Sequence, residues 1–295
     1  MSEAIEFATP YDYYAYLRAE KPVVQEEAEG PFQVARHEDV MKVFRDHKTF
    51  SSDVSLRPPE ERTVPSMLFS DPPIHHRLRK LVSYAFKPGH IEAQRKLIED
   101  RCEELVAELK EHSETELVEA LAAPLPVTVI AHMLGVVDGD IRQFKYWSDK
   151  IFSNIGDILF AQPTPEVEQA SAEMDAYFLE RLEHIRQAPE DNLLGRLVET
   201  ETEDGKLSNE ELLSFCRLLL IAGNETTTGL ITASVRIFDE FPWTFDRVKA
   251  EPELIPTFIE EALRYYSPFS ATVRRTSCDT ELAGVEIPRG ALVIP

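Results

Sequence analysis

The chain has 295 residues, of which 43% are hydrophobic and 28% charged, an ordinary globular composition that can bury a large core. Its formal net charge of −22 argues against binding nucleic acid or an anionic membrane through the overall field. The N-terminus carries no secretory signal, no apolar run is long enough to cross a bilayer, and the three cysteines show no disulfide spacing. We therefore expect a cytoplasmic protein without a membrane segment.

Helical periodicity dominates the sequence, and no internal repeat or low-complexity linker divides it. The predicted helices lie near residues 37–50, 75–86, 91–112, 117–135, 139–153, 164–187 and 208–238. Short β segments are expected near residues 31–36 and 271–289, where turn glycines lie between β-forming residues. The chain is therefore predicted to be mainly α with a small β portion.

The last of these helices has a clear beginning and end. Ser208 and Glu211 form a capping box, with Leu207 and Leu212 placed as a hydrophobic staple across it. Pro242 forbids much extension beyond residue 238. About 30 residues at 1.5 Å each give a helix roughly 45 Å long. Because it is apolar on several sides, we expect it to pass through the middle of the protein.

The middle of this helix breaks the usual rules, because it reads "AGNETT" over residues 222–227. Gly223 costs about 1 kcal/mol relative to Ala, and a buried Glu225 costs several kcal/mol unless it is paired or protonated. Threonine hydroxyls can bond the carbonyl one turn back and bend the helix. Two interpretations remain open from the residues alone. One is a surface-facing stripe with a packing glycine, and the other is a locally opened helix that presents an acid and a hydroxyl to a ligand.

Four segments, in order along the chain, carry a resemblance to a known family. They are "DPPIHHRLRKLVSYAF" (71–86), "AGNETT" (222–227), "EEALRYYSP" (260–268) and "VRRTSCDTELAGVEIPRG" (273–290). They resemble the His-x-x-x-Arg helix, the central-helix signature, the Glu-x-x-Arg helix and the strand pair of the cytochrome P-450 superfamily, the haem-thiolate monooxygenases. The resemblance runs from about residue 10 to the last residue. It implies one cytochrome P-450 domain over residues 1–295, of the soluble bacterial type.

The resemblance implies a haem cofactor, and it assigns cationic residues to the two haem propionates. His75 and Arg79 are four apart, so they share a helix face and can contact one propionate region together. Arg274 would contact the other, with Arg275 as the alternative if the register differs by one. Without the other motifs, His75 and Arg79 would be interpreted as an exposed basic face.

The resemblance also assigns roles on two helices. Ala222 and Gly223 leave room for dioxygen beside the haem, Thr226 donates a hydrogen bond to that oxygen, and Glu225 brings protons through ordered water. No role is assigned to Asn224.

A second helix carries the Glu-x-x-Arg motif, Glu261 with Arg264. In the family this pair is buried and structural. The alternative is a surface ion pair that contributes a few tenths of a kcal/mol.

The largest departure from the family concerns the axial cysteine that holds the iron. In the family it lies in a loop resembling Phe-x-x-Gly-x-x-x-Cys-x-Gly, downstream of the strands at 273–290, and this chain ends at Pro295. Cys102, Cys216 and Cys278 lack that context and are expected to be ordinary thiols. We therefore expect no metal ligand here, and a cytochrome P-450 fold that lacks its C-terminal quarter. The 295 residues alone are expected to associate, to bind haem weakly if at all, and to be inactive.

The expected activity of the full-length enzyme is insertion of one oxygen atom of dioxygen into a mostly apolar small organic molecule. The alternatives are a non-catalytic remnant of the fold and, as a third possibility, an unrelated helical binding protein. The electron donor is expected to be a ferredoxin with its reductase, because the sequence holds no flavin or iron–sulfur segment. Candidate substrate contacts, besides Ala222, are Leu68, Leu218, Ile221 and Thr272.

Overall fold

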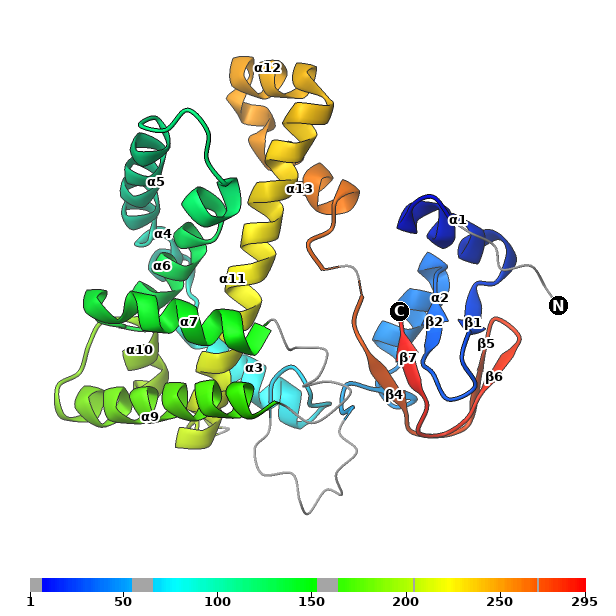
Figure 1. Ribbon diagram of the computed structural model, residues 1–295. Helices are drawn as coiled ribbons and strands as arrows, with labels where there is room; N and C mark the ends of the chain where they lie inside the picture. The colour runs from blue at the N-terminus through cyan, green and yellow to red at the C-terminus, as the bar shows by residue number, and fades with distance from the viewer. Residues whose placement is uncertain (1–6, 55–65, 153–163, 204, 270) are drawn as a thin grey trace. The chain divides into compact units, whose positions relative to one another are not determined.

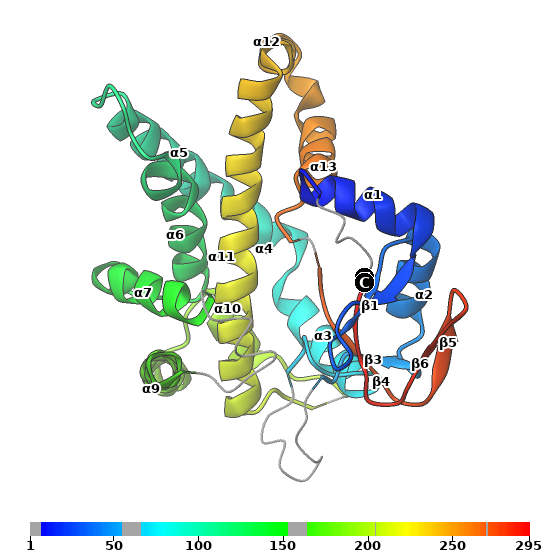
Figure 2. The same cartoon turned by 45° about the vertical axis from the view of Figure 1, so that its right-hand side comes forward.

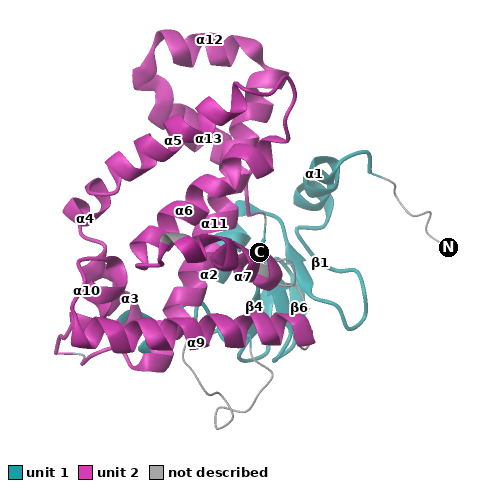
Figure 3. Cartoon of the chain, turned by 60° about the vertical axis from the view of Figure 1, so that its left-hand side comes forward, with its two compact units in different colours: residues 1–76, 271–295 teal, residues 77–270 magenta. Residues whose placement is uncertain are grey.

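The computed structural model describes residues 7–54, 66–152, 164–203, 205–269 and 271–295 (Figure 1). The chain forms two compact units, one of residues 1–76 with 271–295 and one of residues 77–270 (Figure 3). The sequence predicted one domain over residues 1–295, and this stays a prediction.

The first unit contains the β structure together with two helices. Its elements are α1 (Pro10–Glu20), β1 (Val23–Gln25), β2 (Phe32–Val34), α2 (His37–Arg45), β3 (Phe50–Ser51), β4 (Arg274–Thr276), β5 (Thr280–Leu282), β6 (Val285–Ile287) and β7 (Leu292–Ile294). Five strands form a mixed sheet in the order β1-β2-β7-β4-β3, and β5 pairs with β6 as a hairpin. β2 pairs with β7 in parallel and β3 pairs with β4 antiparallel, so the two distant parts of the chain are joined by direct strand pairing.

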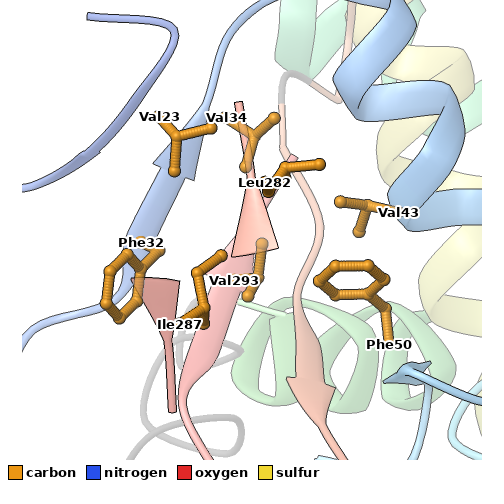
Figure 4. Packing of buried hydrophobic residues seen from close by; sticks show 8 residues of the cluster. All are labelled: Val23, Phe32, Val34, Val43, Phe50, Leu282, Ile287 and Val293. Carbon is orange, nitrogen blue, oxygen red and sulfur yellow. The ribbon is translucent and has the colours of Figure 1, made fainter. Parts of the chain in front are cut away.

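A cluster of buried apolar side chains holds this unit together (Figure 4). Its members come from the sheet, the hairpin and α2: Val23, Phe32, Val34, Val43, Phe50, Leu282, Ile287 and Val293. Burying each such side chain contributes roughly 1.5–3 kcal/mol. The hairpin turns through Ala283 and Gly284, whose φ angles of 50° and 81° are left-handed. The predicted β segments are thus confirmed, and the cluster explains how such short strands are stable.

The second unit is helical. Its elements are α3 (Ile74–Ala85, which begins in the first unit), α4 (Pro88–Glu92), α5 (Arg95–Leu109), the π-helical turn η2 (Val118–Ala122), α6 (Pro124–Met133), the 3₁₀ turn η3 (Asp138–Asp140), α7 (Ile141–Phe152), α9 (Pro165–Gln187), α10 (Leu193–Glu199), α11 (Asn209–Glu240), α12 (Pro242–Ala250), the 3₁₀ turn η4 (Pro252–Leu254) and α13 (Ile255–Tyr265). The mainly helical fold with a small β portion is confirmed. No helix in the described ranges is both long and apolar enough to span a membrane.

Helix α11 is the longest helix of this unit, with 32 residues (Figures 1 and 2). The capping box predicted from the sequence is present: Ser208 accepts a hydrogen bond from the backbone N–H of Glu211, and the Glu211 carboxylate accepts one from the backbone of Ser208. The helix packs against η2, α6, α7, α9, α12 and α13. The helix therefore lies at the centre of the second unit, and its expected passage through the middle of the whole protein stays a prediction.

Candidate functional site

The polar segment of α11 is continuous α-helix, which corrects the expectation of a locally opened helix. The hydroxyl of Thr226 donates to the carbonyl of Ala222, 2.6 Å away and one turn back. The carbonyl of Ala222 thus accepts the Thr226 hydroxyl without interrupting the backbone hydrogen bonds of the helix. Ala222 is exposed and Thr226 is half-buried. The segment therefore presents its hydroxyl from an intact helix.

Gly223 is explained by helix packing. A Cβ added there would lie 2.8 Å from Cδ1 of Ile130 on α6, closer than such atoms pack. The space left by the missing side chain is occupied by α6. For this residue the packing interpretation describes the structure, whereas room for dioxygen at Gly223 stays a prediction.

Glu225 lies half-buried on the side of α11 that faces α7. Burial raises the pKa of its carboxyl, and the negative charge of Asp149 on α7 raises it further, while Lys145 opposes the change. Lys145 and Asp149 are themselves paired at 2.7 Å along α7. Glu225 therefore holds a proton more readily than an exposed glutamate, as a proton donor requires.

Asn224, to which the sequence assigned no role, is buried, with 1% of its surface exposed. Its Nδ2 donates to Oγ of the fully buried Ser148 on α7 at 2.9 Å, and its Oδ1 lies 3.4 Å from the hydroxyl of Thr228. The sequence signal was weak, because an asparagine beside a glutamate in a polar run gives no indication of which side chain faces inward.

Helix α3 carries the two predicted cations His75 and Arg79, one turn apart. His75 is half-buried, while Arg79 is exposed. The guanidinium of their neighbour Arg77 donates instead to Glu211 at 2.6 Å and to the carbonyl of Lys206 at 2.9 Å. Arg77 is therefore committed to holding the start of α11, and Arg79 is the exposed arginine of this helix.

The two adjacent arginines of β4 are used differently. Arg275 donates to the carbonyl of Val54 at 3.0 Å and to that of Gly290 at 2.6 Å. Arg274 donates only to the carbonyl of its neighbour Val273, at 2.8 Å, and its guanidinium lies 5.3 Å from the ring centroid of Phe44. Burial lowers the pKa of both guanidinium groups. Most N–H groups of Arg274 thus have no acceptor among the described residues, which is the condition expected of an anion-binding arginine.

Glu261 and Arg264 are paired at 2.7 Å on α13, but both side chains are exposed, at 58% and 67%. The burial implied by the family resemblance is therefore wrong for this structure. No described residue covers that face of the helix, so solvent screens the charges. Their pairing is confirmed, and their structural role stays a prediction.

The candidate substrate contacts fall in both units. Leu218 and Ile221 are half-buried on α11, in the second unit. Leu68 is 48% exposed and Thr272 half-buried, and both belong to the first unit. Their grouping around a substrate stays a prediction.

The three cysteines are free thiols. Cys216 is completely buried in α11, and burial raises the pKa of its thiol, as it does for the half-buried Cys102. Cys278 is exposed in the bend between β4 and β5. Within the described ranges, no cluster of three or more His, Cys, Asp or Glu side chains is placed to hold a metal ion.

Comparison of this chain with known proteins identifies its family. No model of a protein family matches the chain. The putative cytochrome P450 YjiB of Bacillus subtilis is 35% identical over 294 residues, which are 97% of this chain and 72% of that protein. The erythromycin C-12 hydroxylase of Saccharopolyspora erythraea is 38% identical over 288 residues, covering 96% of this chain and 71% of that protein. The chain belongs to the cytochrome P450 family.

Solved structures agree with this assignment. CYP109E1 from Bacillus megaterium, in complex with testosterone, superposes with a TM-score of 0.85 and 36% identity over 97% of this chain and 75% of that one. The cytochrome P450 fold of this chain is therefore shared with solved members. The P450 family consists of haem monooxygenases, so membership implies a haem cofactor, dioxygen as co-substrate and a source of electrons for this P450.

Proposed function

We propose that this cytochrome P450 hydroxylates a mostly apolar small organic molecule, with Glu225 and Thr226 of α11 supplying the protons. The observation that carries the proposal is the pairing, in consecutive positions of one intact helix, of a half-buried carboxyl and a hydroxyl. The similarity to an erythromycin hydroxylase and to a P450 solved with testosterone supports a bulky, largely apolar substrate. Leu68, Leu218, Ile221, Ala222 and Thr272 are the proposed contacts with it.

The donor set fits a cofactor that carries carboxylates. His75, Arg79 and Arg274 would hold the two haem propionates, and the unused N–H groups of Arg274 support this choice over Arg275. A charge-assisted hydrogen bond of this kind contributes roughly 1.5–3 kcal/mol. Ala222 and Gly223 are proposed to lie beside the haem on α11.

Bound haem supplies the activation of dioxygen, one atom of which enters the substrate while the other leaves as water. Two protons are consumed in that change, and the chain must deliver them. Glu225, whose pKa is raised by burial, holds a proton at its carboxyl and passes it on through water. The Thr226 hydroxyl donates to the Ala222 carbonyl, so its lone pairs can accept a hydrogen bond, and it donates elsewhere only by exchanging that bond.

The axial thiolate is proposed to come from none of the three cysteines considered above. A thiolate is the form that binds iron, and burial disfavours it at Cys216 and at Cys102. Cys278 lies exposed to water in the bend between β4 and β5. A protein made of these 295 residues is therefore expected to give no thiolate-type carbon monoxide spectrum after reduction with haem present.

The electron donor is proposed to be a ferredoxin with its reductase. Three free thiols are consistent with a reducing compartment, and we propose the cytoplasm.

The proton-delivery proposal is tested with Glu225→Gln in the full-length enzyme expected from the sequence, loaded with haem. Removing a general acid costs roughly 10²–10⁴-fold in rate, so we expect a loss of at least about 100-fold in product formation with haem and substrate binding retained. Glu210→Gln is the matched control, because Glu210 is an exposed glutamate on the first turn of the same helix. Equal activities of the two variants would contradict the role of Glu225.

A further inference from the structure

Three buried polar side chains, one on α7 and two on α11, form a hydrogen-bonded network between these helices. Ser148 on α7 is fully buried, Asn224 is 1% exposed and Thr228 is 8% exposed. The Asn224 Nδ2 to Ser148 Oγ distance is 2.9 Å, and these are the buried side-chain partners that cross from one helix to the other. A buried polar group without a hydrogen-bond partner lowers the stability of the fold, so each side chain of this network constrains where the others lie.

The same hydrogen-bonded network extends to η2, where one backbone carbonyl lacks a backbone N–H partner. The carbonyl of Ala122 would accept from the N–H of residue 126 in a regular helix, but residue 126 is proline and has none. The hydroxyl of Thr228 donates to this carbonyl at 3.1 Å. Thr228 therefore satisfies a buried acceptor that Pro126 leaves without a backbone donor, and α11 is held to η2 as well as to α7.

These contacts define a direction on α11. Asn224 and Thr228 are one turn apart and share a face, which is turned toward Ser148 and Ala122. Glu225 follows Asn224 by about 100° around the helix, and Thr226 follows by about 200°. A rotation of α11 that moved Asn224 away from Ser148 would move Glu225 and Thr226 by the same angle.

We propose that Asn224 is a positioning residue, which fixes the rotation of α11 against α7 and η2 and thereby holds Glu225 beside α7 and Thr226 about 200° around the helix from the bonded face. The inference rests on the proposed function for the roles of Glu225 and Thr226, but not for the packing. Apolar side chains alone tolerate small rotations, whereas the amide, hydroxyl and carbonyl groups have donors and acceptors in fixed directions.

The electrostatic surroundings of Glu225 report on this rotation. The charged groups that act on it are Asp149 and Lys145, both on α7 and on either side of Ser148 along the helix. If the hydrogen bonds of this network are removed, α11 can rotate, and Glu225 is no longer held against α7. The burial of the carboxyl then decreases, and its pKa falls toward the ordinary value of about 4.3.

The experiment compares Ser148→Ala, Asn224→Leu and the double variant by two measurements that need neither haem nor turnover. Urea unfolding gives stability, and a carbon-13 NMR titration gives the pKa of Glu225, assigned with Glu225→Gln. The double variant leaves no polar partner of this pair unsatisfied, so its unfolding midpoint should recover toward that of the parent relative to Asn224→Leu. Its Glu225 pKa should nevertheless remain lowered.

Recovered stability together with an unchanged Glu225 pKa would overturn the proposal, because the network would then be structural only. If the double variant does not fold, Ser148→Ala alone decides, since it removes one hydroxyl and must also lower the pKa. Thr232→Val is the matched control: among the described residues the hydroxyl of Thr232 bonds the carbonyl of Thr228, within α11, so this variant should leave the pKa of Glu225 unchanged. An equal shift in this control would also overturn the proposal. Failure of the proposed monooxygenase role would appear in activity and not in this titration.

Discussion

The two sides of α11 between residues 222 and 228 have similar composition but opposite surroundings. On one side Asn224 and Thr228 are buried and bonded to α7 and η2. On the opposite face, about 160–200° around the helix from Asn224, Ala222 is exposed, and the hydroxyl of Thr226 bonds the carbonyl of Ala222 in the same helix. The difference teaches that a polar run in a central helix is not one site: half of it can be helix packing while the other half stays available to a ligand.

The neighbouring arginines of β4 repeat this contrast, and substituting them sharpens it most. Arg275→Ala should destabilise the protein by about 2–4 kcal/mol, because the carbonyls of Val54 and Gly290 lose a charged donor. Arg274→Ala should cost less, about 1 kcal/mol, since it loses one bond to the carbonyl of Val273 and the contact of its guanidinium with the Phe44 ring. Urea unfolding of both variants measures the difference, and equal losses would show that the two arginines are used alike.

Asn224→Ala is the next largest expected effect and concerns the buried side of α11. It removes the amide that bonds Ser148, leaving that buried hydroxyl without its partner, so we expect a loss of about 1–3 kcal/mol in unfolding free energy. Thr227→Ala, at an exposed position of the same helix, should change stability by about 0.5 kcal/mol or less. A costly Thr227→Ala with a neutral Asn224→Ala would reverse the assignment of the two sides.

Gly223→Ala tests whether the helix glycine serves packing. The new methyl group would lie 2.8 Å from Cδ1 of Ile130, the end of a side chain that can turn away. Because Ala also favours the helix by about 1 kcal/mol over Gly, we expect a small net loss of about 0.5 kcal/mol. Ile130→Val removes that Cδ1, and the double variant should recover part of the loss. Thermal unfolding of the four proteins completes the cycle. Strict additivity of the two substitutions would show that the side chains do not meet.

The pH dependence of Glu225→Gln is the smallest expected effect. Because the pKa of Glu225 is raised in the folded protein, its contribution to stability is fully present below the unfolded pKa and is lost as pH rises through the folded value. Glu225→Gln should therefore gain stability relative to the parent as the pH increases from about 4 toward neutrality. Paired unfolding curves over that range measure it, and a difference that is constant with pH would contradict the raised pKa.

Much of this fold follows from local sequence signals. The Ser208–Glu211 capping box predicted where α11 begins, and Pro242 limited where it ends. The short strands β1, β3 and β7 could not be predicted, because two or three residues show no alternation and their stability comes from distant pairing, as between Phe32 and Val293. Sequence patterns signal regular local structure but give little indication of which distant partner completes it.

The candidate site shows the same division. The motif around Glu225 and Thr226 was visible in the sequence because it breaks helix preferences. The inward role of Asn224 was not, since it depends on Ser148, 76 residues away. Likewise, choosing Arg274 over Arg275 requires knowing which backbone carbonyls lie near each guanidinium.

The central claim is that Glu225 and Thr226 of α11 deliver protons, and one measurement tests it most directly. Hydrogen peroxide released per reduced nicotinamide consumed is compared for Thr226→Ala and Thr227→Ala in the full-length, haem-loaded enzyme with its electron donor. Thr227 is the matched control, because it is an adjacent threonine that is exposed on the same helix. The account predicts that Thr226→Ala still binds substrate but diverts most reducing equivalents to peroxide, while Thr227→Ala behaves as the parent. Unchanged product yield in Thr226→Ala, or equal peroxide from both variants, would contradict it.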